Sequence, residues 1–163
     1  MIDDDDDSGF DFNEEMPDEE REEYEREYRE EKRRLKNHPL YIQAMEVLQL
    51  ARVLNESMTE EEREMQGGLM MQSAYMLAPK IAGAMGSGSW LICMQNAAII
   101  REHANFLLLS SHGLRSFTKT DPEHIKLFRR EMESFRALFR DWCKEIHAMP
   151  PGEVDDEWGL FIR

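Results

Sequence analysis

Cysteine is scarce in this sequence, and the two that occur do not form a recognisable site. Cys93 and Cys143 stand far apart, each within an apolar stretch of helical periodicity. Neither a disulfide framework nor a zinc-type pair has this arrangement. We therefore expect two reduced, buried and chemically inert thiols.

Long hydrophobic runs are also missing. No apolar stretch approaches the ~18 residues that a membrane-spanning helix requires. The sequence opens Met1-Ile2-Asp3 and continues with aspartate at positions 4–7, which is the opposite of a secretory signal. We expect a cytoplasmic protein with no membrane partner.

No catalytic or cofactor motif stands out. A di-iron bundle needs Glu-x-x-His on two helices, and only Asp121 with His124 has a comparable spacing. Cys143 and His147 lie four residues apart, a spacing that suits a thiolate pair or half of a metal site. Because no second half accompanies them, a surface histidine near a helix end is the favoured interpretation. We expect no cofactor and no enzymatic activity.

One glycine-rich stretch, Gly86-Ser87-Gly88-Ser89, precedes a predicted helix and offers backbone donors for a phosphate. It lacks the lysine of a P-loop, and it follows a helix where a dinucleotide fold needs a strand. A flexible connection is therefore the favoured interpretation.

Positive charge is nearly absent from the first part of the chain. Residues 1–31 hold 17 acidic residues and three arginines, a net charge of −14, whereas residues 32–163 hold 17 acidic and 17 basic residues. Residues 1–16 have too few apolar groups to offset the entropy of ordering, so we expect a disordered acidic tail. Such a tail usually maintains solubility; the alternatives are docking to a basic protein partner and mimicry of a nucleic-acid backbone.

Residues 17–37 have the pattern of a charged, exposed helix. Glu25 with Arg29 and Glu30 with Arg34 are spaced four apart in the favourable order, as are Glu22 and Arg26. The segment should end at Asn37-His38-Pro39, because the residue before a proline avoids the α-helical region.

Residues 39–149 predict an antiparallel up-and-down four-helix bundle, so the fold class is all-α. The first helix begins near Pro39. The second opens with a capping box, Thr59 with Glu62, and should bend near Tyr75 to Pro79 before a loop marked by Gly83, Gly86 and Gly88. The third, capped by Ser87 or Ser89, should run from Trp90 to about His112 and end at Gly113.

The fourth helix has the clearest pattern. It should open either with a capping box, Thr120 with Glu123, or with Asp121 as the cap and Pro122 in the first turn. Large side chains then recur at alternating steps of three and four, which predicts the main core seam: Ile125, Phe128, Met132, Phe135, Phe139, Trp142, Ile146 and Met149.

The third helix is apolar on more than one face. Such a helix is either central in a bundle or covered by another subunit. We predict a homo-oligomer whose interface includes Trp90, Ile99 and Phe106.

A basic strip follows the fourth helix opposite its core seam. Glu131, Glu133 and Asp141 interrupt it, so a solvated face is favoured over a nucleic-acid or partner-binding face. Its members are Lys126, Arg129, Arg130, Arg136 and Arg140.

Residues 150–163 combine acidic residues with Trp158, Leu160 and Phe161. We favour a strap folded back onto the bundle; the alternative is a linear peptide that enters a groove on a partner.

The stretch Leu77-Ala78-Pro79-Lys80-Ile81-Ala82-Gly83-Ala84 resembles a segment of the four-helix-bundle proteins encoded in intervening sequences of large ribosomal RNA genes, and of the related retroelement accessory protein. Those proteins carry Pro-x-Asn-Ile-Ala-Glu-Gly there, form pentamers, and in some cases bind nucleic acid and reverse transcriptase. The segment is shortened here to Lys80-Ile81-Ala82-Gly83, and the body has no net positive charge.

Three other stretches are similar to uncharacterised small bacterial helical proteins, a set with no assigned activity: residues 38–41, 94–101 and 157–161. Together these observations predict a non-enzymatic interaction or scaffold protein. The alternative is an accessory nucleic-acid-binding protein.

Overall fold

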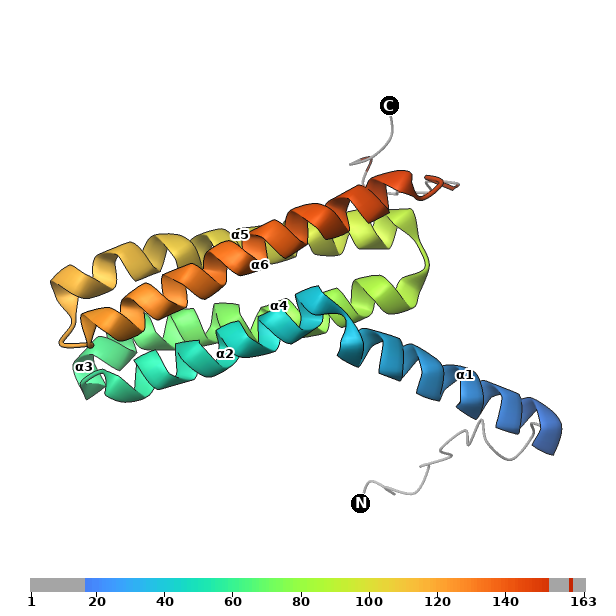
Figure 1. Ribbon diagram of the computed structural model, residues 1–163, viewed down its shortest axis with the longest axis horizontal. Helices are drawn as coiled ribbons and strands as arrows, with labels where there is room; N and C mark the ends of the chain where they lie inside the picture. The colour runs from blue at the N-terminus through green and yellow to red at the C-terminus, as the bar shows by residue number, and fades with distance from the viewer. Residues whose placement is uncertain (1–16, 153–158, 160–163) are drawn as a thin grey trace, which may run out of the picture. The chain divides into compact units, whose positions relative to one another are not determined.

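The computed structural model describes residues 17–152 and Gly159, and every regular element in these residues is helical (Figure 1). The prediction of an all-α fold is confirmed. The chain divides into two units, residues 1–34 and residues 35–163. The predicted disorder of residues 1–16 and most of the predicted strap lie outside the described residues.

Helix α1 (Asp18–Asn37) is built from charged residues and has no buried side chain. Two of the predicted pairs form, Arg29 with Glu25 at 2.7 Å and Arg34 with Glu30 at 4.0 Å. Exposed pairs of this kind contribute only about 0.3–0.5 kcal/mol each. Local ion pairing and acidic residues in its first turn, rather than burial, therefore favour this helix.

Helix α2 (Pro39–Ser57) begins where predicted, directly after the break at His38. The His38 Nδ1 atom accepts a hydrogen bond from the backbone N–H of Leu40 at 3.2 Å, and so caps the helix. The buried residues of α2 recur at helical spacing and so form one face of the helix. They are Leu40, Ala44, Val47, Leu48, Ala51 and Leu54.

The next helical stretch combines α3 (Glu60–Glu62), the π-helical segment η1 (Arg63–Gly67) and α4 (Gly68–Ser87). The predicted capping box is confirmed, because Thr59 accepts from the N–H of Glu62 and Glu62 accepts from the N–H of Thr59. The helix continues through Pro79 to Ser87, and a π-helical segment that was not predicted, η1, precedes it.

Gly67 explains the position of η1. A Cβ atom at Gly67 would lie 2.1 Å from Asn55 Oδ1 and 3.1 Å from Met58 Sδ. The absence of a side chain therefore lets this turn approach the end of α2 closely, a role that the general cost of glycine in helices does not reveal.

The predicted loop at Gly83, Gly86 and Gly88 is shorter than expected. Gly83 and Gly86 lie within α4, and only Gly88, with φ +60°, ends it in the left-handed conformation. Burial of Ile81 and Ala84 on the opposite face explains why the helix tolerates both glycines.

Helix α5 (Trp90–Phe117) also runs further than predicted. Ser89 is its cap, accepting from the N–H of Ile92 at 3.4 Å. The expected end at Gly113 is wrong, because the helix continues to Phe117. Leu114, directly after the glycine, is almost fully buried, and this packing keeps the last turn helical.

Helix α6 (Pro122–Ala148) uses the second of the two predicted caps, since Asp121 accepts from the N–H of Glu123 at 2.9 Å. The alternative capping box at Thr120 is wrong. Thr120 is buried, and its hydroxyl accepts a hydrogen bond from Ser57 at 3.3 Å. In the predicted seam all side chains are buried except Phe139 and Met149, which are half-buried against the core.

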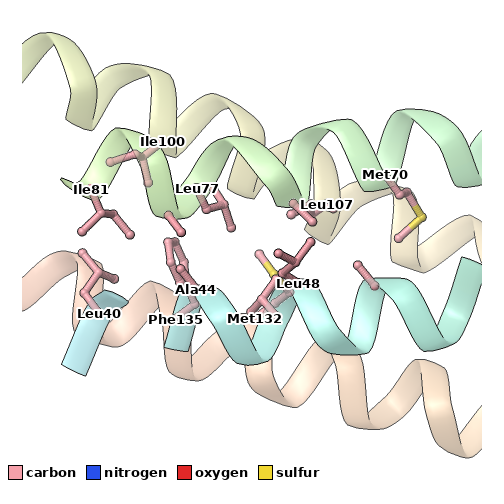
Figure 2. Packing of buried hydrophobic residues seen from close by; sticks show 14 of the residues in the cluster. Leu40, Ala44, Leu48, Met70, Leu77, Ile81, Ile100, Leu107, Met132 and Phe135 are labelled. Carbon is pink, nitrogen blue, oxygen red and sulfur yellow. The ribbon is translucent and has the colours of Figure 1, made fainter. Parts of the chain in front are cut away.

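Four long helices share one core in the unit formed by residues 35–163. Helix α2 packs against α4 and α6, and α5 packs against the same two helices (Figure 1). Figure 2 shows Leu40 and Ala44 of α2 facing Ile81 of α4, Ile100 of α5 and Phe135 of α6. All four helices therefore contribute to a single hydrophobic cluster.

Candidate interaction surfaces

The residues of the predicted basic strip are all exposed on α6, but carboxylates pair with most of them. Lys126 lies 3.7 Å from Glu123, Arg130 lies 3.1 Å from Glu131, and Arg136 pairs with Glu133. The strip is thus not a continuous positive surface. Its charge is concentrated at two places, one near Arg129 and one near Arg140.

The basic hollow, defined by His112, Arg115, Lys126 and Arg129, lies where the end of α5 meets the start of α6. It encloses about 380 Å³, and Glu123 also lines it. An Arg129 guanidinium nitrogen lies 3.4 Å from His112 Nε2. The hollow therefore gathers cationic groups from two helices, although one carboxylate dilutes them.

The arginine-rimmed groove lies between α5 and α6 and has a volume of about 230 Å³. Its floor is apolar and consists of Ala104, Leu108, Met132, Phe135 and Phe139. Its rim carries Arg101, Arg136 and Arg140, together with Asn105. Within residues 17–152, neither Arg101 nor Arg140 forms an ion pair with a carboxylate.

The residues predicted as an oligomer interface are only half-buried, and two of them pack inward. Trp90 and Phe106 contact the hydrophobic core, and Ile99 is of intermediate exposure. Part of the apolar excess of α5 is therefore explained by packing within this unit.

A different surface, which we call the apolar patch, consists of Met65, Leu69, Leu109 and Phe117. Met65 and Phe117 line one hollow of about 320 Å³ between η1 and the end of α5. Met65 and Leu109 are 71% exposed and Phe117 is 82% exposed, which is high for large apolar side chains. Sequence reasoning missed this patch because it ended the third helix at Gly113.

A sequence signal for the patch exists in retrospect. Leu109, Gly113 and Phe117 are spaced four apart and so share one face of α5. Gly113 lines the same hollow as Phe117 and lies one turn after Leu109. The glycine interpreted as a helix end thus lies in the middle of the patch.

The candidate catalytic and metal-binding residues do not assemble. Among the described residues, no group of three or more His, Cys, Asp or Glu side chains could hold a metal ion. Burial raises the pKa of the Cys143 thiol, although Arg101 opposes the shift. A raised pKa disfavours the thiolate, which is the nucleophilic and metal-binding form.

Two other polar groups are used in packing. His103 Nδ1 lies 3.2 Å from the hydroxyl of Ser73, which joins α5 to α4. Cys93 is buried, and its thiol donates to the carbonyl of Ala84 at 3.2 Å.

The Gly86–Ser89 stretch forms a tight turn whose polar groups are occupied. Ser87 donates to the carbonyl of Ala84 at 2.8 Å and accepts from the N–H of Ser89 at 3.2 Å. Ser89 in turn caps α5. This arrangement supports a structural connection and not a phosphate loop.

No helix within residues 17–152 is both long and apolar enough to cross a membrane. No protein-family model matches the chain, and no curated protein matches it. The resemblance to the ribosomal intervening-sequence and retroelement proteins therefore remains a prediction.

Proposed function

We propose that this chain is a non-enzymatic, cytoplasmic interaction protein, in which residues 39–149 form an antiparallel up-and-down four-helix bundle that self-associates through the apolar patch. The observation that carries the proposal is the exposure of four large apolar side chains, of which Met65 and Phe117 line one hollow, Leu69 follows Met65 at the start of α4, and Leu109 precedes Phe117 on α5. Burying a large apolar side chain contributes about 1.5–3 kcal/mol, so these four offer a substantial driving force.

A second copy of the chain is the occupant that the charge distribution favours. Residues 32–163 have equal numbers of acidic and basic residues, so two such bodies do not repel each other. In a two-fold contact the same patch faces itself, which pairs apolar with apolar surface. Half of the acidic residues of the chain lie in residues 1–31, where they are available to a basic protein partner, and Glu62 lines the hollow of the patch.

The test is the mass of the full chain in solution, measured by light scattering. We expect a closed oligomer for the unchanged chain and a monomer for the double variant Leu109→Glu, Phe117→Glu. Ile42→Glu, which alters an exposed apolar side chain on α2, is the matched control and should leave the mass unchanged. Circular dichroism must show the same helical content in all three proteins. A monomeric unchanged chain would contradict the proposal.

The basic hollow supports a second candidate, an accessory nucleic-acid-binding protein. Arg115, Lys126 and Arg129 bring three cationic side chains from two helices to one place. Binding should then weaken steeply with added salt, because phosphate contacts release counterions. Arg115→Ala with Arg129→Ala should flatten that dependence, and absence of binding at low salt would exclude this candidate.

A further inference from the structure

The arginine-rimmed groove combines two features that select a particular class of ligand. Its floor is aromatic and aliphatic, and its rim carries three arginines. Arg136 already pairs with Glu133, whereas Arg101 and Arg140 form no ion pair with a carboxylate within residues 17–152. The hydrogen bond from Lys144 and, to a lesser extent, the Arg140 charge lower the pKa of the neighbouring Asp141. A ligand with large apolar side chains next to carboxylates would satisfy both the floor and the rim.

The chain itself contains such a segment. Residues 153–163 read Glu-Val-Asp-Asp-Glu-Trp-Gly-Leu-Phe-Ile-Arg, so that Asp155, Asp156 and Glu157 directly precede Trp158 and Phe161. We propose that this segment docks in the arginine-rimmed groove of its own chain, with its carboxylates on the rim and its large apolar side chains on the floor.

The lengths of the two parts agree. At 1.5 Å per residue, Arg140 lies about 12 Å and Met132 about 24 Å back along α6 from its end at Ala148. An extended chain covers about 3.3 Å per residue, so the three carboxylates come within about 10–17 Å of Gly152, and Phe161 within about 30 Å. The carboxylates therefore reach the level of Arg140, and Phe161 reaches the level of Met132 at the far end of the floor.

The backbone after α6 permits the required change of direction. Pro150 and Pro151 prevent the helix from continuing, and Gly152 follows with φ +66°, a left-handed conformation that glycine adopts without strain. Docking of this kind goes beyond self-association, because the groove and the apolar patch share no residue.

The test uses the full chain with fluorinated tryptophan and follows the fluorine NMR signal of Trp158, assigned with Trp158→Phe. We expect a signal displaced from that of free indole, independent of protein concentration, and moving toward the free position as salt is added. Arg140→Glu should lower the ratio of docked to free segment about tenfold, because like charges then meet. Arg130→Glu, on the same helix but outside the groove, should have no effect.

A variant in which the two opposite charges are exchanged provides the second part of the test. In Arg140→Glu combined with Asp156→Arg, the docked signal should return, which a merely structural effect of Arg140 would not produce. A Trp158 signal at the free-indole position in the unchanged chain would overturn the proposal, as would insensitivity to Arg140→Glu. Dependence on protein concentration would assign the segment to a second copy and equally overturn it. Leu109→Glu with Phe117→Glu should not move the signal, which separates this result from the test of self-association.

Discussion

At the scale of single residues, glycines with the same local cost have different roles in this molecule. Gly67 is buried where η1 meets the end of α2, whereas Gly83 has no atom within 4 Å of a Cβ built on it. Intrinsic helix propensity treats the two alike. Only the neighbouring helix distinguishes them.

This difference predicts opposite effects of alanine. Gly67→Ala should lower the free energy of unfolding by about 1–3 kcal/mol, because its Cβ would displace Asn55 and Met58. Gly83→Ala should raise it by up to about 1 kcal/mol, since alanine restricts the unfolded chain and meets no obstacle. Urea unfolding measures both. Equal stability of the two variants would show that η1 does not approach α2 closely.

At the scale of elements, one polar contact joins α2 to α6 beside the apolar core. Gln43 Nε2 donates to Glu131 Oε2 at 2.9 Å and to the Glu131 carbonyl at 3.1 Å. The hydrogen bond from Gln43 holds the pKa of the Glu131 carboxyl below its usual range; partial burial opposes this shift, and Arg130 adds to it. The contact connects residues 88 positions apart and so helps to set the register of these two helices.

The lowered pKa of Glu131 makes the free energy of unfolding depend on pH. A carboxyl whose pKa is lower in the folded state stabilises that state when ionised, and this contribution is lost as pH falls through the folded-state pKa. Gln43→Met should therefore reduce the free energy of unfolding by about 1 kcal/mol near neutral pH. The difference from the unchanged chain should narrow in acid, where the carboxyl is protonated.

The matched control is Gln49→Met, which alters an exposed glutamine on the same helix. It should change stability by less than about 0.5 kcal/mol at any pH. Thermal unfolding between neutral and acidic pH distinguishes the two variants. A loss for Gln43→Met that stays constant across this range would assign the effect to the carbonyl contact alone.

At the scale of the whole molecule, charge and packing are separated along the chain. Residues 1–31 carry the net charge, whereas residues 35–163 hold the hydrophobic cluster. Helix α1 has no buried side chain. Stability should therefore reside almost entirely in the second unit.

Removal of residues 1–34 tests this division. The shortened chain should unfold cooperatively, with a free energy of unfolding within about 0.5 kcal/mol of that of the full chain, because exposed charged residues contribute little. Urea unfolding followed by circular dichroism measures the difference. A loss of several kcal/mol would show that residues 1–34 contribute to the packing of the second unit.

The all-α class and most helix starts were predictable from the sequence, because these features depend on local chemistry. Large apolar side chains recur at steps of three and four residues from Ile125 to Ile146, and this pattern predicted the buried face of α6. Thr59 with Glu62 predicted the capping box at the start of α3. Such patterns involve atoms within one or two turns of the same helix.

The tertiary structure alone decided which interruptions end a helix and which side chains meet across helices. Gly113 and Gly86 resemble helix ends in sequence, yet packing of Leu114 and Ala84 on the opposite faces keeps both segments helical. For the same reason the candidate surfaces could be predicted only in part. Arg136 and Arg140 were identified on α6, but Arg101 joins them, and Met65 joins Phe117, only because separate helices pack side by side. Helical periodicity specifies the face that each helix buries, and it contains no information on which residues of another helix will lie beside the exposed ones.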